Sequence, residues 1–302
     1  MRLSLRDFMP IGLLRLNRAL KHYRRQVQLD DVIEDISGFA QKYSIEHNKE
    51  CVIIGNGPSL TEIIEGHISF FENKSVFCVN AFSTSDYFEV IRPQFYVFAD
   101  YLYWDKKALE FYDVIHRTRD ALISKVNWPL VLCFPISAKI WNFAIDIPVH
   151  NKNISIIYYN NNLNDSEDKF YKYKENTAAP LCQTVTISAL FLGLNLGFSS
   201  VYLAGVDMSL HKNIHVTQNN VVCNRDEHFY DIDKAQLKPW LKDLNTPITM
   251  DLLFYRLSLM FRGFIEMEEY SKFLGAKVYN LSKNSFIDAF ERIDLNELKS
   301  ND

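Results

Sequence analysis

Short apolar runs alternate along the chain with longer stretches in which apolar residues recur at helical spacing. Many of the runs are rich in β-branched and aromatic residues, which predicts strands buried on both faces. Helical patterns separate them, such as residues 187–196 and 250–274. The alternation predicts an α/β fold with a doubly wound, mostly parallel Rossmann-type sheet. The predicted strands are residues 51–54, 75–79, 94–99, 130–134, 154–158, 201–204 and 277–280.

Two polar stretches interrupt this pattern. Residues 158–174 are rich in Asn and Tyr, and residues 209–249 carry several His, Asp and Asn residues. Both are predicted to be exposed loops or lids, and a long loop inside a compact domain is usually functional or mobile. We therefore expect one α/β domain over residues 46–302, with a lid-like insertion at about 208–249.

The first 45 residues form a separate segment by composition. Arg and Lys alternate there with Leu, Ile, Phe and Met, which predicts a basic amphipathic helical segment, broken near Pro10 and Gly12. Such a helix either lies on an anionic membrane surface, where each basic residue is worth about 1 kcal/mol, or packs on the domain with a solvated basic face. Both alternatives stay open.

Composition limits the class of protein. The 302 residues are 48% hydrophobic, and the net charge of -4 gives no general attraction for nucleic acid, so no nucleic-acid partner is expected. Cys51, Cys78 and Cys133 lie in apolar runs and are expected to be reduced core residues. No apolar run reaches the roughly 20 residues of a membrane span, and no signal peptide is recognised. We expect a cytoplasmic protein, associated with the inner face of the cell membrane if the N-terminal helix binds there.

The run Cys51-Val-Ile-Ile-Gly-Asn-Gly-Pro-Ser-Leu60 predicts a strand, a glycine turn and the start of a helix. Gly55 and Gly57 permit a tight turn, and Ser59 with Glu62 matches a capping box. Free backbone N–H groups at such a corner favour a phosphate. Leu60 in place of a third glycine, and Asn80 in place of a carboxylate after the next strand, argue against a dinucleotide.

Polar residues follow several predicted strands, where open α/β sheets bind their ligands. They are Asn80, Asp100 and Asp207. Hydroxyls near turns or helix starts, above all that of Thr184, could complete a phosphate site. For each of these residues, capping of a helix or turn is the alternative. The other hydroxyls are those of Ser59, Thr186, Ser282 and Ser285.

His228 is the candidate general base, because it lies among charged and aromatic residues in Arg225-Asp-Glu-His-Phe-Tyr-Asp231. Tyr230 could donate a hydrogen bond to a departing phosphate, or anchor the loop. A solvated loop histidine is the alternative for His228. A metal site could use Asp207, His211 and His215, or the tripeptide Asp231-Ile-Asp233. Turn and extended residues in the segment 213–220 argue against the first set, and short tripeptides are common by chance. No metal ligand is assigned.

Three motifs occur together and in order: Gly55-Asn-Gly-Pro-Ser-Leu60 with Asn80, Leu196-Gly-Phe-Ser-Ser-Val-Tyr-Leu-Ala-Gly-Val-Asp207, and Val278-Tyr-Asn-Leu-Ser-Lys-Asn-Ser285. Together they resemble bacterial sialyltransferases of glycosyltransferase family 42 and the related DUF115-like glycosyltransferases of surface-polysaccharide loci. The resemblance runs from about Cys51 to Arg292. It implies a GT-A-like variant of the Rossmann-type scaffold that works without a metal ion or cofactor, with a CMP-activated sugar as donor substrate.

By this resemblance Asn56, Asn80, Thr184 and Asp207 line the nucleotide site, and His228 takes the place of the catalytic histidine. The sequence differs from the family pattern at three other positions: Val185 and Thr186 replace a Ser-Gly pair, and Asp100 replaces an asparagine.

The expected reaction is metal-independent, inverting transfer of a sialic-acid-like nonulosonic acid to a glycan or glycolipid acceptor of capsule or lipopolysaccharide. The Gly55 to Ser59 amides, Thr184 and Tyr230 would stabilise the leaving phosphate. Alternatives are a glycosyltransferase that uses a nucleotide-diphosphate sugar, a pterin diphosphokinase-like phosphotransferase that uses ATP and Mg²⁺, and a non-catalytic nucleotide-binding or scaffold protein. A homo-oligomer also stays open.

Overall fold

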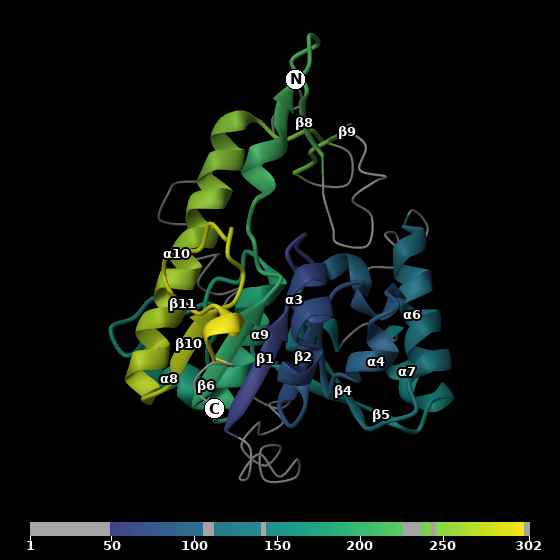
Figure 1. Ribbon diagram of the computed structural model, residues 1–302. Helices are drawn as coiled ribbons and strands as arrows, with labels where there is room; N and C mark the ends of the chain where they lie inside the picture. Colours follow the sequence, from purple (N-terminus) through teal and green to yellow (C-terminus); the bar gives the residue numbers. More distant parts are fainter. Residues whose placement is uncertain (1–48, 105–111, 140–142, 226–236, 243–245, 299–302) are drawn as a thin grey trace, which may run out of the picture. The chain divides into compact units, whose positions relative to one another are not determined.

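The computed structural model describes residues 49–104, 112–139, 143–225, 237–242 and 246–298 (Figure 1). The chain divides between Glu34 and Asp35 into two units, and every described residue belongs to the second. The predicted amphipathic segment over residues 1–45 therefore lies outside the described residues.

An eight-stranded sheet forms the centre of the second unit, and all of its strand pairs are parallel. The strand order is β11-β10-β6-β1-β2-β3-β4-β5. The predicted doubly wound parallel sheet is confirmed, and each predicted strand lies within two residues of an observed one. The strands are β1 (Glu50–Ile54), β2 (Ser75–Val79), β3 (Phe95–Val97), β4 (Leu130–Pro135), β5 (Ile154–Tyr159), β6 (Ser200–Ala204), β10 (Lys277–Asn280) and β11 (Glu291–Arg292).

The strands alternate their side chains between two buried faces, as a parallel sheet requires. On β1, Cys51 and Ile53 join the main hydrophobic cluster, whereas Val52 and Ile54 are buried outside it, on the opposite face. Helix α9 (Val185–Asn195) packs against strands β1, β2, β3 and β6 and is buried through almost its whole length. The continuous apolar sequence of this helix is thus explained by its position between the sheet and a second helix.

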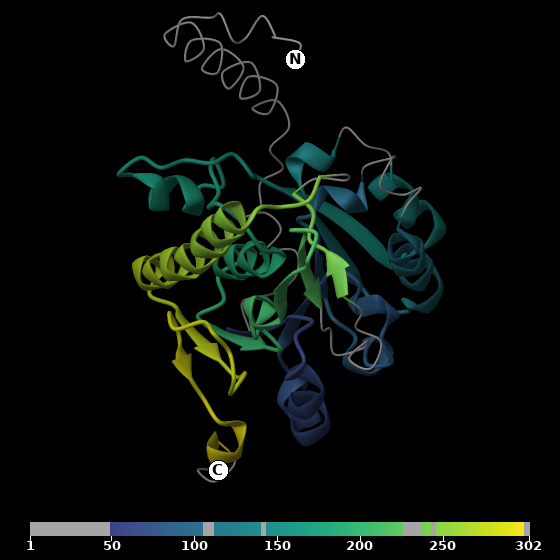
Figure 2. The same ribbon diagram turned by 90° about the horizontal axis from the view of Figure 1, so that it is seen from above.

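That second helix is α10 (Met250–Leu274), which lies beside α9 in both views of the ribbon (Figures 1 and 2). The two helices approach closely at Gly263, where an added Cβ would lie 2.6 Å from Cδ1 of Ile187. The predicted helix over residues 250–274 is confirmed at both ends. Its close contact with α9 needs a residue without a side chain at position 263.

Shorter helices complete the unit. They are α3 (Leu60–His67), α4 (Phe88–Ile91), α6 (Asp113–Lys125), α7 (Phe143–His150), α8 (Lys169–Lys174) and α11 (Leu295–Leu298). The 3₁₀ turns are η2 (Ile68–Phe71), η3 (Phe82–Thr84), η4 (Tyr101–Tyr103), η5 (Ile136–Ala138) and η6 (Leu210–Asn213). No helix among the described residues is long and apolar enough to cross a membrane. All five cysteines are free thiols, and Cys51, Cys78 and Cys133 are buried as predicted.

The chain reverses its direction of travel across the sheet between β1 and β6. From β1 it proceeds outward through β2, β3, β4 and β5, and it then returns to the other side of β1 with β6 and continues to β10 and β11. In open α/β sheets the point of reversal leaves a crevice outside the carboxyl ends of the two strands, and ligands bind there. The topology therefore predicts a ligand-binding crevice at the carboxyl ends of β1 and β6.

The two stretches predicted to be loops are more ordered than expected. Residues 158–174 include the end of β5 and helix α8, and Asn160 is only 2% exposed, because its backbone and side chain take part in local turns. In residues 209–249 the described part holds an antiparallel sheet in the order β7-β8-β9. Its strands are β7 (Ile214–Val216), β8 (Val222–Arg225) and β9 (Leu237–Pro239). The secondary structure in both stretches was not predicted, and the role of residues 208–249 as a lid-like insertion stays a prediction.

Candidate functional site

A cavity of about 240 Å³ opens at the reversal point of the sheet, close to the lower end of the roughly 300–1,000 Å³ typical of ligand pockets. We call it the switch-point cavity. Its walls are the segments that follow β1 and β2, the first turn of α9, the segment that follows β6, and one side chain of α10. The described lining residues are 55–58, Val79, Asn80, 183–186, Gly205, 207–210 and Met260.

The glycine corner after β1 is closed by contacts within the chain. The Gly55 N–H donates to the Ala204 carbonyl at 2.8 Å, and the Gly57 N–H donates to the Gly205 carbonyl at 2.8 Å. The Ser59 N–H donates to Oδ2 of Asp207 at 3.1 Å. These three amides therefore already have partners within the chain, which disfavours a phosphate bound to them, and the predicted nucleotide-binding role of this corner stays a prediction.

The glycines serve the packing of two neighbouring backbones. A Cβ at Gly57 would lie 2.0 Å from Oδ2 of Asp207, and a Cβ at Gly55 would lie 2.5 Å from the Gly205 carbonyl oxygen. Gly205 itself has a φ of +66°, a conformation that favours glycine. The glycines thus allow the turn after β1 to lie directly against the turn after β6.

Asp207 supplies the negative charge that the start of α3 favours. Its side chain lies at the positive end of the α3 dipole and is 4% exposed. Burial raises the pKa of the Asp207 carboxyl, and the hydrogen bonds from Ser59 and the charge of Lys212 oppose that rise. A carboxylate of the chain therefore stands where the sequence predicted a ligand phosphate.

The predicted capping box is absent as well. The Ser59 side chain makes no capping hydrogen bond at α3. It donates instead to Oγ of Ser282 at 3.0 Å, and that same oxygen accepts the Val206 N–H at 3.1 Å. Ser59 and Ser282 thereby tie the start of α3 to the segments that follow β6 and β10.

Two amide side chains that line the cavity, those of Asn56 and Asn80, carry buried oxygens without partners. Asn56 is 9% exposed, and its Nδ2 donates to the Val79 carbonyl at 3.2 Å, whereas its Oδ1 has no partner. Asn80 has a φ of +52°, its carbonyl accepts the Tyr96 hydroxyl at 2.5 Å, and its Oδ1 also lacks a partner. A buried acceptor left unpaired costs about 1–3 kcal/mol, so a bound donor group would be favoured here.

The first turn of α9 faces the same cavity and presents its positive end. Thr184, Val185 and Thr186 line the cavity, the Thr184 side chain makes no capping hydrogen bond, and the first turn contains no acidic residue. Helix α3 differs in this respect, because the carboxylate of Asp207 lies at its start and accepts the Ser59 N–H. The predicted importance of Thr184 as a helix start facing the crevice agrees with this geometry.

Three predicted nucleotide-binding residues do not line the cavity: Ser59, described above, and Asp100 and Ser285. Asp100 is exposed, caps η4 by accepting the Leu102 N–H at 3.0 Å, and does not line the switch-point cavity. The Ser285 hydroxyl donates to the Val206 carbonyl at 2.7 Å and accepts the Ile287 N–H at 3.2 Å. Turn capping, the alternative considered for Asp100 and Ser285, is the role that the structure gives them.

The predicted catalytic pair, His228 and Tyr230, lies outside the described residues, as do Asp231 and Asp233. Among the described residues no group of three or more His, Cys, Asp and Glu side chains could hold a metal ion. The His211 ring packs edge-on against Phe286, with 4.2 Å between the ring centroids. Aromatic packing thus accounts for the position of this histidine.

Several lining residues could not be identified from the sequence. Gln183, 208–210 and Met260 come from a loop, the segment after β6 and the apolar face of a helix. Only the proximity of Gln183 to the predicted helix start offered a signal.

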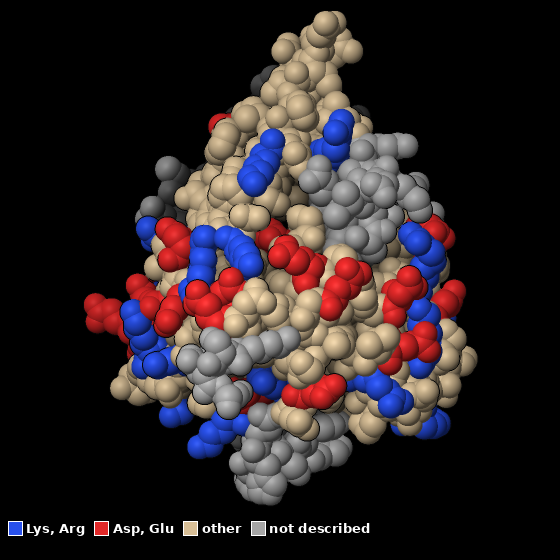
Figure 3. Space-filling model, viewed as in Figure 1, with Lys and Arg blue, Asp and Glu red and all other residues tan. Residues whose placement is uncertain are grey.

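On the face drawn in Figure 3, Lys and Arg side chains are interspersed with Asp and Glu, without a broad area of one sign. The described residues of this face therefore form no basic track, and the expected absence of a nucleic-acid partner stays a prediction.

Comparison with known proteins yields little. No known protein family matches the chain, and no curated protein matches it. Among solved structures, the MAf glycosyltransferase from Magnetospirillum magneticum AMB-1 superposes with a TM-score of 0.48 and 15% sequence identity, over 82% of this chain and 33% of that one. The chain thus spans about a third of that structure, and the likeness is remote.

Proposed function

We propose that the chain is a glycosyltransferase that binds a nucleotide-activated sugar in the switch-point cavity. The observation that carries this proposal is the combination of an uncapped helix start at Thr184 with the unpaired amide oxygens of Asn56 and Asn80. The helix start favours an anion, and the two oxygens favour hydroxyl or amino donors. A nucleotide offers both kinds of group in one molecule.

The phosphate is assigned to the first turn of α9. At the start of α3 a phosphate would meet the carboxylate of Asp207, which already accepts the Ser59 N–H. At α9 the backbone N–H groups of Val185 and Thr186 lie in the first turn, where helical partners are missing. The ribose or base would then lie towards Asn56 and Asn80 on the other side of the cavity.

The donor is proposed to be a CMP-activated nonulosonic acid, as the resemblance to family 42 enzymes implies. A departing monophosphate carries less charge than a departing diphosphate, so hydrogen bonds and a helix dipole suffice to stabilise it. The described lining of the cavity contains one carboxylate, Asp207, and no lysine or arginine. Such a lining suits a ligand of modest negative charge.

In this reaction His228 takes the proton from the acceptor hydroxyl, which attacks the anomeric carbon while the bond to the phosphate oxygen breaks. The configuration is inverted, the bonding electrons leave with CMP, and Tyr230 donates a hydrogen bond to the departing phosphate. The acceptor is a surface glycan or glycolipid. We place the reaction in the cytoplasm, because the five free thiols suit a reducing compartment.

A thermal-shift panel tests the donor class, because a ligand that binds only the folded state raises the unfolding temperature. The panel contains CMP, CDP, UDP, GDP and ATP, each with and without Mg²⁺. Stabilisation by CMP that does not depend on Mg²⁺ is expected. Stabilisation by ATP with Mg²⁺ alone would contradict the proposal and favour a phosphotransferase, and stabilisation by a diphosphate with Mg²⁺ alone would favour a nucleotide-diphosphate sugar.

A further inference from the structure

A second and larger cavity, of about 490 Å³, lies between the segment 163–181 and helix α10. We call it the α8–α10 cavity. One wall comes from the Asn- and Tyr-rich stretch that the sequence predicted to be a loop, and the other comes from one side of α10. Leu163 and Ala179 pair as an isolated parallel bridge on the first wall, which joins the two ends of that segment.

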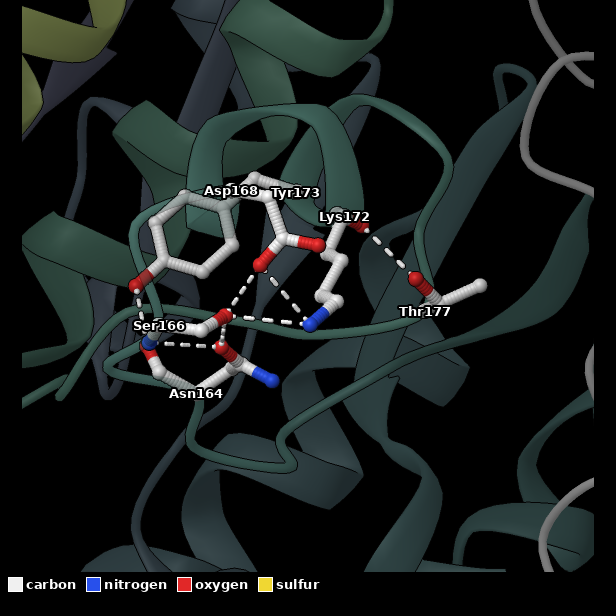
Figure 4. A network of polar contacts seen from close by, with 6 residues as sticks. All are labelled: Asn164, Ser166, Asp168, Lys172, Tyr173 and Thr177. Carbon is white, nitrogen blue, oxygen red and sulfur yellow. Dashed lines mark hydrogen bonds and ion pairs between the residues drawn. The ribbon is translucent and has the colours of Figure 1, made fainter.

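The first wall is held in place by its own polar contacts. Figure 4 shows the side chains of this network turned towards one another. The Ser166 N–H donates to Oδ1 of Asn164 at 2.9 Å, Lys172 Nζ lies 2.9 Å from Oδ1 of Asp168, and the Tyr173 hydroxyl is 3.3 Å from the Asn164 carbonyl. These contacts fix the segment before any ligand binds, which lowers the entropy cost of binding.

Glu266 joins the two walls. Its Oε1 accepts the Tyr173 hydroxyl at 2.8 Å and lies 3.1 Å from Nζ of Lys169. The Tyr173 side chain is 1% exposed, and its own neighbours restrict it, so the carboxylate of Glu266 is held at a fixed position on the cavity wall. A fixed acceptor of this kind fixes the orientation of a bound ligand in addition to contributing affinity.

The charges of the cavity argue against an anionic ligand. Three carboxylates face two cations, and one of the cations, Lys169, already pairs with Glu266. The carboxylates and the amide oxygen of Asn164 can accept hydrogen bonds from hydroxyl groups. The guanidinium of Arg262 and the amide nitrogen of Asn164 can donate hydrogen bonds to them. The charged lining residues are Asp165, Lys169, Arg262, Glu266 and Glu269.

Apolar side chains alternate with these polar groups. Leu163 is 53% exposed and Ile265 is 47% exposed at the cavity, and Leu181 and Leu259 also line it. Hydroxyl groups next to apolar C–H faces are the surface that a sugar ring presents. Polar groups that fix orientation among apolar side chains are also the general composition of a small-molecule site.

The two cavities are lined in part by different residues of the same segments. Leu181 lines the α8–α10 cavity, and Gln183, two residues later, lines the switch-point cavity. On α10, Leu259 and Arg262 line the former, whereas Met260 lines the latter. Neighbouring residues of two segments, 181–183 and 259–262, thus line both cavities.

We propose that the α8–α10 cavity binds a neutral, polyhydroxylated saccharide segment of the acceptor. Glu266, Glu269 and Arg262 hydrogen-bond its hydroxyls, and Leu163 and Ile265 pack on its apolar faces. The role as an acceptor subsite rests on the proposed glycosyl transfer, whereas the binding of a saccharide here can be measured without it.

The test uses the full chain and three neutral probes: maltotetraose, N-acetylchitotetraose and a mannotetraose, each followed by saturation-transfer NMR and titration calorimetry. Leu163→Arg and Ile265→Arg fill the cavity at exposed positions. Val90→Arg on α4 is the matched control, because Val90 is 62% exposed and does not line the cavity. We expect at least one probe to bind the wild-type chain. Each cavity variant should weaken the affinity for that probe about tenfold or more, whereas Val90→Arg should bind it with the affinity of the wild type.

Equal binding to the wild-type chain and both cavity variants would overturn the assignment, and so would a lack of binding by all three probes. A lysine-rich peptide is titrated in parallel, and its binding with loss in the same variants would assign the cavity to a protein partner instead. CMP stabilisation is measured on the same samples. Its absence beside intact saccharide binding would contradict only the proposed donor site, and the reverse result would contradict only this inference.

Discussion

The carboxylate of Asp207 lies against the backbone of Ser59, with Oδ2 3.1 Å from the amide nitrogen, although 148 residues separate the two in sequence. This contact fills the helix start that a glycine-rich corner would otherwise offer to a phosphate. It leaves the first turn of α9 as the uncapped helix start at the switch-point cavity among the described residues.

Gly57→Ala tests the close approach that this contact requires. An added Cβ would lie 2.0 Å from Oδ2 of Asp207, so either the carboxylate or the turn must move. We expect a loss of about 1–3 kcal/mol in the free energy of unfolding, measured by urea denaturation. Gly66→Ala in α3 is the control, because nothing lies within 4 Å of its Cβ position, and alanine there should be neutral or stabilising. Equal stability of the two variants would show that the corner tolerates a side chain.

Asp207→Asn tests the buried charge through its pH dependence. Burial raises the pKa of Asp207 in the folded chain above the ordinary value of 3.8. At a pH between the unfolded-state pKa and the folded-state pKa, the folded chain therefore binds more protons than the unfolded chain. The contribution of Asp207 to stability therefore falls as the pH rises through that window and is constant above it. The free energy of unfolding of the wild type minus that of the variant, followed from roughly pH 3 to pH 7, should decrease with pH. An increase would mean that the folded-state pKa is lowered.

His228→Ala separates catalysis from binding. Loss of a general base typically slows a reaction by about a hundredfold to ten-thousandfold. We expect transfer from a CMP-activated sugar to fall by that factor, while the thermal stabilisation by CMP remains that of the wild type. His215→Ala is the control, because His215 is an exposed residue of β7 and does not line the switch-point cavity. Turnover by His228→Ala at the wild-type rate would remove this residue from the mechanism.

The regular elements could be predicted because their signals are local. The apolar run from Cys51 to Ile54 and the helical pattern of α10 each depend on a few neighbouring residues, and both agree with the structure. The small antiparallel sheet was missed because β9 is exposed throughout and β7 is exposed at two of its three residues. Such strands lack the alternation of buried and exposed residues that identifies a strand.

The candidate site was predicted only in part, since its chemistry depends on distant contacts. Asn56, Asn80 and Thr184 were named from the sequence and line one cavity. The partners of the glycine corner could not be predicted, because three of its amides are bonded to Ala204, Gly205 and Asp207, which no local pattern reveals.

The most direct test of the proposed phosphate position is a calorimetric titration of CMP into the wild type, Thr184→Asp and Thr184→Asn. Aspartate at this N-cap position would close α9 as Asp207 closes α3, and would repel a phosphate while stabilising the helix. Asparagine caps the helix without the charge, so it controls for capping alone. We predict CMP binding by the wild type, a loss of about tenfold or more in affinity for Thr184→Asp, and a smaller loss for Thr184→Asn. Binding of CMP by Thr184→Asp with the affinity of the wild type would contradict the account.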